Sequence, residues 1–245
     1  MSEYNYNEKY FETIDSEHKA YWLGFLYADG YVEPIYRKDK IKAFRIEIGL
    51  SIEDKHHLEL FLQDIESDVP ISERKQKIGN NTHSTCRVRV NNTKMCRDLI
   101  SLGCTTRKSL TLEFPSSDIV PQEYLKDFIR GYFDGDGCIS YSERDYVDKR
   151  NNKQYTQKNI VSSFIGTHDF LSDLSEILSD NDINFSFNKK PNCGKASEIR
   201  LTKHSDILNL YSYIYNGATI FLSRKKEKFI NAFDKLNIQI PASYS

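Results

Sequence analysis

The sequence lacks the features that mark several large classes of protein. Only five of its 245 residues are cysteine, and none forms a C-x-x-C pair, so neither a disulfide framework nor a thiolate zinc site is indicated. No run approaches the roughly 18 apolar residues of a transmembrane helix, and the first residues show no secretory signal pattern. The six histidines form no H-E-x-x-H or similar ligand spacing. We therefore expect an intracellular protein, in the cytoplasm or an organelle, that is not secreted.

An excess of one charge is also absent. The 34 Lys and Arg residues balance 35 Asp and Glu residues, for a net charge of -1, which argues against a uniformly basic nucleic-acid binder. With 39% hydrophobic and 28% charged residues, the composition is that of a folded soluble chain and not of a disordered one. The length allows one large domain or two repeats of roughly 100 to 120 residues.

The charge is nevertheless segregated along the chain. Residues 71–110 contain nine basic residues against two acidic ones, residues 187–205 five against one, and residues 144–158 five against two. Residues 53–68 and 169–182 are instead acidic, and the spacing of their apolar residues predicts an amphipathic helix in each.

The basic segments have the period of half-buried strands. In one of them Arg87 and Arg89 alternate with Cys86, Val88 and Val90, and ASEIRLTK alternates in the same way. A merely solvated sheet face would carry such charges too, but their recurrence in both halves favours a surface that binds a nucleic-acid backbone. The predicted DNA contacts are Arg45, Arg74, Lys75, Lys77, Arg87, Arg89, Lys189, Lys190, Lys195, Arg200 and Lys203.

The chain also contains an internal repeat. WLGFLYADG at 22–30 is matched by IRGYFDGDG at 129–137. After each copy come a β-rich stretch, an acidic helix, a basic pair of strands, a short helix and an Arg-Lys pair, so each half is predicted to be αββαββα. Pro and Ser turn signals between the halves lead us to assign the first repeat to 1–110, a linker to 111–121 and the second repeat to 122–245.

Small residues in each nonamer predict close packing of two helices. Gly24 and Ala28 are four residues apart, as are Gly131 and Gly135, so each pair lies on one helix face. Such spacing allows two helix backbones to approach each other closely.

The acids near the end of each nonamer predict a metal site. Asp29 and Asp136 would end two helices, where the helix dipole disfavours a carboxylate by roughly 0.3 to 1 kcal/mol. If the helices pair, the two carboxylates repel each other unless a cation lies between them. Carboxylate oxygens near phosphates favour Mg²⁺. Gly30 and Gly137 suit the left-handed position just past a helix end. The alternative to a metal site is that Asp-Gly only stops each helix, but two matched copies favour the metal site.

The two nonamers resemble the motif of the LAGLIDADG homing endonucleases, in the single-chain form that carries two motifs. The matching segments are Trp22–Gly30 and Ile129–Gly137. The first departs from the motif at Tyr27, where family members usually have an acid. With the element order included, the resemblance covers residues 17–236.

The resemblance implies an α+β fold, in which two pseudo-symmetric repeats form a saddle of two antiparallel four-stranded sheets with the motif helices packed at the centre. It implies an endodeoxyribonuclease, a phosphodiester hydrolase of intron homing that makes a magnesium-dependent double-strand break in a long asymmetric DNA site. Asp29 and Asp136 would be catalytic metal ligands, assisted by the backbone carbonyls of Ala28 and Gly135.

The resemblance also implies a basic residue beside each acid. By position, Lys108 and Lys225 are the candidates for a catalytic role in stabilising negative charge or organising solvent. For both lysines an ordinary phosphate contact is the alternative.

Because both motif copies lie on one chain, we expect a monomer that binds double-stranded DNA, with no protein partner required and no membrane. The alternative function is that of a non-cleaving DNA- or RNA-binding relative, such as an intron splicing maturase or a transcription regulator, which needs the basic surface but no competent metal centre. Retention of both acids favours the enzyme. An unrelated α/β protein would require two coincidental motifs.

Overall fold

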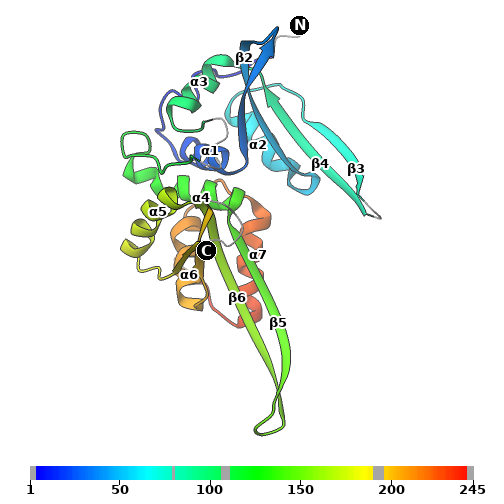
Figure 1. Ribbon diagram of the computed structural model, residues 1–245, viewed down its shortest axis with the longest axis vertical. Helices are drawn as coiled ribbons and strands as arrows, with labels where there is room; N and C mark the ends of the chain where they lie inside the picture. The colour runs from blue at the N-terminus through cyan, green and yellow to red at the C-terminus, as the bar shows by residue number, and fades with distance from the viewer. Residues whose placement is uncertain (1–3, 79–80, 106–110, 190–195, 242–245) are drawn as a thin grey trace. The chain divides into compact units, whose positions relative to one another are not determined.

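The computed structural model describes residues 4–78, 81–105, 111–189 and 196–241 (Figure 1). The chain forms two compact units, Met1–Gly135 and Asp136–Ser245. The division falls just before the last residue of helix α4 (Leu125–Asp136). The first unit therefore includes the second motif helix, whereas the sequence repeat starts at residue 122. Within the described ranges, no helix combines the length and apolar character needed to cross a membrane.

The first unit begins with the first motif helix and continues with two hairpins, each followed by a helix. All positions from Ala20 to Tyr27 are buried, as expected of a helix that is apolar on every side. In chain order the elements are α1 (Glu17–Ala28), β1 (Gly30–Arg37), β2 (Lys40–Ser51), the 3-10 turn η1 (Ile52–Asp54), α2 (Lys55–Asp64), β3 (Ser72–Ile78), β4 (Asn81–Val90), α3 (Thr93–Ser101) and, before α4, the 3-10 turn η3 (Gln122–Tyr124).

The sheet of the first unit is antiparallel, with strand order β1-β2-β4-β3. Ile46, Ile48 and Val88 are buried on one face, which α2 and α3 cover. Arg87 and Arg89 point to the other face because strand side chains alternate. The apolar pattern of the sequence therefore determines which side chains remain open to solvent.

The second unit repeats this plan after the second motif. Its sheet has the order β5-β6-β8-β7 and is again antiparallel. Ile199 and Leu201 are buried on the covered face. Its elements are β5 (Cys138–Asp148), β6 (Lys153–Thr167), α5 (His168–Asp180), β7 (Ser186–Lys189), β8 (Ala196–Leu201), α6 (His204–Tyr215) and α7 (Ser223–Leu236).

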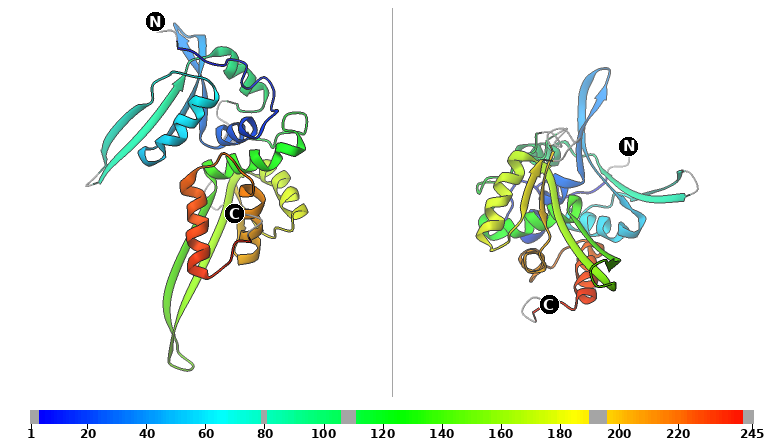
Figure 2. Two further views of the ribbon diagram at one scale, coloured as in Figure 1. Left: turned by 180° about the vertical axis from the view of Figure 1, so that it is seen from behind. Right: turned by 60° about the horizontal axis from the view of Figure 1, so that its bottom comes forward.

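Two features distinguish the second unit. The β5–β6 hairpin extends beyond the helices (Figure 1), and α7, red in Figure 2, lies beside β5. Phe229 and Phe233 bury one face of α7 against Tyr211 of α6. The predicted α+β fold with two four-stranded antiparallel sheets is confirmed, but the second repeat has one helix more than αββαββα.

Candidate active site

The two motif helices pack against each other within the first unit. A Cβ atom on Gly24 would overlap the carbonyl oxygen of Phe128, and one on Gly131 would overlap that of Tyr21. One turn further along, a Cβ on Gly135 would overlap the side chain of Ala28. These small residues therefore allow backbone-to-backbone contact, as their spacing predicts.

Both motif acids lie at helix C-terminal ends. Asp29 is the C-cap of α1, and its N–H donates to the carbonyl of Phe25 at 2.9 Å. Asp136 is the last residue of α4. Both residues are exposed, so their carboxylates are accessible to a ligand.

The glycines after these acids do not have the expected conformation. Among the described glycines only Gly103 and Gly217 have positive φ, so the left-handed prediction for Gly30 and Gly137 is wrong. Gly30 is instead the first residue of β1, where a Cβ would overlap Leu26. Glycine is therefore required at position 30 because the helix end packs closely against it, and not because the backbone adopts a left-handed conformation.

Ala28 and Gly135, whose carbonyls were predicted to assist metal binding, are in contact with each other. Each directly precedes a motif acid in the chain. No group of three or more His, Cys, Asp or Glu side chains able to hold a metal ion occurs among the described residues. The available donors are thus a carboxylate and a main-chain carbonyl at each helix end, which are hard oxygen ligands of the kind Mg²⁺ prefers.

A buried polar relay supports the second motif helix, and the sequence alone gave no indication of it. The Tyr21 hydroxyl donates to Oδ2 of Asp134 at 2.9 Å and lies 2.9 Å from Nε2 of His57. Asp134 is two residues before Asp136. Burial lowers the pKa of His57 to about 4, so the imidazole is neutral at pH 7.

Arg130, in the same helix, is fully buried and doubly paired. Its guanidinium lies 2.7 Å from Oε1 of Glu17 on α1 and 2.7 Å from Oδ1 of Asp127. It also lies over the Tyr21 ring, 5.4 Å from the centroid. Burial raises the pKa of Asp127, although Arg130 acts in the opposite direction. The pair with Glu17 links α4 to α1 close to the motif.

The second unit places one predicted catalytic lysine beside its motif. Lys225 is buried in the first turn of α7, and its Nζ donates to the carbonyl of Gly137. Gly137 directly follows Asp136. Lys108, the corresponding candidate of the first repeat, lies outside the described residues.

Three arginines predicted to contact DNA are paired with acids on the open face of the first sheet. Glu33 pairs with Arg45, and Glu47 accepts from both Arg87 at 3.0 Å and Arg89 at 2.6 Å. The face is therefore less basic than the sequence segment suggested. Each of these arginines therefore lies beside a carboxylate on this face.

The remaining predicted contacts divide by strand register. Arg74 lies opposite Thr85 and so points to the open face. Lys75 and Lys77 point to the same side of the sheet as Glu73, which is the covered side because Glu73 pairs with Lys55 of α2. In the second unit the open-face residue is Arg200, 4.0 Å from Glu198. Lys189 points to the covered side of the sheet, and Lys203 is the N-cap of α6. Lys190 and Lys195 lie outside the described residues.

Known proteins match this chain in structure but not in sequence. Neither a protein-family profile nor a curated protein matches the sequence. Several solved structures match the fold. The K262A mutant of I-SmaMI has a TM-score of 0.60 at 13% identity, covering 89% of this chain and 92% of that one.

Two other matches are complexes with DNA. The LAGLIDADG meganuclease I-AabMI, bound to uncleaved DNA, has a TM-score of 0.57 at 13% identity and covers 89% of this chain and 90% of that one. The LAGLIDADG homing endonuclease I-SmaMI, bound to cleaved DNA, has a TM-score of 0.56 at 15% identity and covers 92% and 91%. Each match spans both halves of this chain within one partner chain. The protein therefore has the fold of the single-chain LAGLIDADG homing endonucleases.

Proposed function

We propose that this protein is a site-specific endodeoxyribonuclease that makes a double-strand break in a long, asymmetric DNA site. The observation that carries the proposal is the pair of motif helices, which contact each other through Gly24, Gly131 and the Ala28–Gly135 contact. Each of these helices ends in an exposed aspartate. A helix C-terminus is an unfavourable place for a carboxylate. The presence of an aspartate at the C-terminal end of both helices therefore supports a role in binding cations.

Asp29 and Asp136, with the carbonyls of Ala28 and Gly135, would hold Mg²⁺. When bound, the cation would lower the barrier to in-line attack by water on a phosphodiester and stabilise the leaving 3′ oxygen. The small number of protein ligands suits Mg²⁺, which usually keeps several waters and also binds substrate phosphates.

Other residues of the chain would position DNA and stabilise charge. The ammonium group of Lys225 is held at Gly137, beside Asp136, where it can stabilise negative charge that develops on the phosphate. Arg87, Arg89 and Arg200 on the open sheet faces, each with a glutamate nearby, would contact the duplex. Because one chain supplies both motifs, the protein would act as a monomer.

The test is a selection for cleaved sites from a randomised DNA library in Mg²⁺, followed by cleavage and binding assays on the selected site. Asp29→Asn and Asp136→Asn should each abolish double-strand cleavage, while binding in Ca²⁺ stays within about tenfold of the unaltered protein, because phosphate contacts dominate affinity.

The matched control is Asp39→Asn. Asp39 is exposed and has a φ of 59° in the β1–β2 turn, a conformation that Asn adopts readily. This variant should cut normally. Cleavage by either motif variant at the normal rate would contradict the proposal. DNA binding with no cleavage by the unaltered protein would instead indicate a non-cleaving relative.

A further inference from the structure

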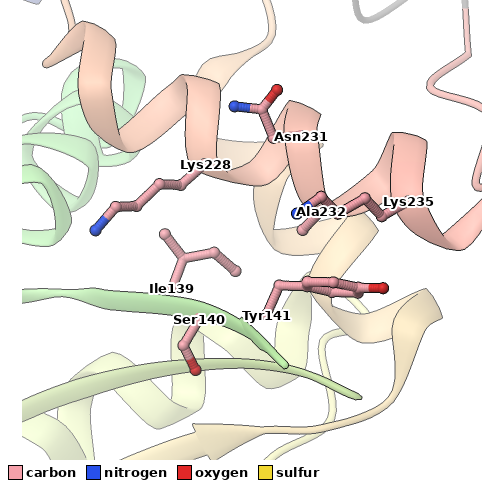
Figure 3. A pocket seen from close by; sticks show the side chains of 7 residues that line it. All are labelled: Ile139, Ser140, Tyr141, Lys228, Asn231, Ala232 and Lys235. Carbon is pink, nitrogen blue, oxygen red and sulfur yellow. The ribbon is translucent and has the colours of Figure 1, made fainter. Parts of the chain in front are cut away.

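Helix α7 and the edge strand β5 of the second unit enclose a groove outside the candidate active site (Figure 3). Its volume is about 330 Å³, at the lower end of the roughly 300 to 1,000 Å³ usual for ligand pockets. Ile139 and Tyr141 line it from the strand, and Lys228, Asn231 and Lys235 line it from the helix. The groove thus combines an apolar floor with a rim of hydrogen-bond donors.

The polar residues of the rim form one stripe along α7. Lys228, Asn231 and Lys235 are spaced by three and four residues, so they lie on one helix face. Arg224, four residues before Lys228, extends the same stripe. Among the described residues, no carboxylate pairs with Lys228 or Lys235. The paired arginines of the first sheet differ from these lysines in that respect.

Neighbouring groups concentrate positive charge on this side of the helix. The Lys235 ammonium lies 5.0 Å from the centroid of the Tyr141 ring, a cation–π distance. Lys158 of β6 donates to the carbonyl of Lys235 at 2.9 Å. Glu143, two residues beyond Tyr141 on β5, accepts the hydroxyl hydrogen of Tyr141. The groove therefore suits an extended anion.

The groove begins close to the candidate active site. Lys225, one turn before Lys228 on α7, reaches the carbonyl of Gly137, and β5 begins at the next residue, Cys138. From Lys225 to Lys235 the helix rises by about 15 Å. That length corresponds to about four nucleotides on one strand of a duplex, at roughly 3.4 Å each.

We infer that the α7–β5 groove binds the phosphodiester backbone of the DNA strand next to the scissile phosphate, with Lys228 and Lys235 as phosphate ligands and Asn231 as a hydrogen-bond donor. The inference rests on the proposed function and extends it from the sheet faces to a helix. A small phosphorylated ligand presents the same chemistry, so the experiment has to separate the two.

The test uses the full chain with the double substitution Lys228→Gln and Lys235→Gln. Fluorescence anisotropy with a duplex of about 30 base pairs, longer than the expected site of roughly 20, gives the affinity at several salt concentrations. The slope of the logarithm of the binding constant against the logarithm of the salt concentration should become shallower by about two, since each lost phosphate contact reduces the slope by about 0.9. The affinity near physiological salt should fall about tenfold.

Lys226→Gln is the matched control. This variant removes one charge from the same helix, but Lys226 lies over the ring of Phe221, 4.2 Å from its centroid, and does not line the groove. Its salt dependence should equal that of the unaltered protein. If the double variant also keeps the original salt dependence, the groove is not a DNA contact and the proposed endonuclease function still stands. No DNA binding by the unaltered chain would overturn both.

Methyl NMR signals of Ile139 and Ala232, which line the groove, separate the two ligand sources. We expect them to shift on addition of the duplex. A shift with inorganic phosphate but not with the duplex would overturn the inference in favour of a small phosphorylated ligand.

Discussion

The helices α1 and α4 carry the same motif but are held in place by different interactions. Both are buried over eight consecutive residues, Ala20 to Tyr27 and Asp127 to Asp134. In the first helix none of these eight residues is charged, and aromatic rings pack around Trp22. The second buries Asp127, Arg130 and Asp134 in a network of ion pairs and hydrogen bonds. At matching motif positions, Tyr27 donates to the carbonyl of Leu102 and Asp134 accepts from Tyr21.

This contrast shows which parts of the motif the helix contact requires. Both helices keep small residues at the contact, since the close approach leaves no room for larger side chains. Both also end in an exposed aspartate. The other positions differ in charge and size. We conclude that the motif preserves the contact and the two acids, while the support behind each helix can be built from unlike chemistry.

The sharpest test of this comparison replaces the buried charge in α4. Arg130→Met should lower the free energy of unfolding by about 3 to 5 kcal/mol, because it removes the cation that lies against the buried carboxylate of Asp127. Leu23→Met, at the matching position of α1, should cost less than about 1.5 kcal/mol. Urea denaturation of both variants measures the difference. Equal losses would contradict the distinction between the two helices.

Much of this arrangement could be predicted from the sequence. Gly131 and Asp136 of the second nonamer match Gly24 and Asp29 of the first. These matches predicted paired helices that end in acids, because helical spacing determines which side chains share a face. Strand alternation likewise placed Arg87 and Arg89 on the open face. These features depend on local periodicity, which the sequence contains.

What could not be predicted depends on contacts between residues distant in the chain. The partnership of Tyr21 with Asp134 joins positions 113 residues apart, and no local pattern links them. The pairing of Glu47 with two arginines depends on strand register. The position of Gly30 after a helix end predicted a left-handed conformation. The structure shows instead that glycine is required there because a larger residue would overlap Leu26.

A second prediction concerns the contact that both helices share. Gly131→Ala should destabilise the protein by about 3 kcal/mol, because its Cβ would meet the backbone of Tyr21. Gly24→Ala should cost a similar amount, since it meets the backbone of Phe128. Gly49→Ala is the control, because its nearest neighbour would be Nε of Arg87 at 3.8 Å. Thermal or urea unfolding would reveal whether one helix tolerates the added methyl group better than the other.

The smallest predicted change is a pH dependence of stability that arises at His57, which packs against Trp22 and Phe25 of α1 and hydrogen-bonds to Tyr21. Burial lowers the pKa of His57 to about 4, below the roughly 6.5 of an unfolded histidine. Between these values the unfolded chain binds more protons than the folded one, so stability falls as the pH is lowered from about 6.5 toward 4. At pH 5 the loss from this residue is about 2 kcal/mol.

His57→Phe removes this titration and keeps an aromatic ring among Trp22, Phe25 and Phe61. The variant should therefore lose less stability than the unaltered protein between pH 7 and pH 5, whatever its stability at pH 7. His168→Gln is the control for the loss of an exposed histidine, here on α5. The three proteins contain the same carboxylates, so the difference between their profiles isolates His57. Parallel profiles for His57→Phe and the unaltered protein would mean that Tyr21 and the surrounding rings accept a charged imidazole, and the pH dependence expected from this site would be absent.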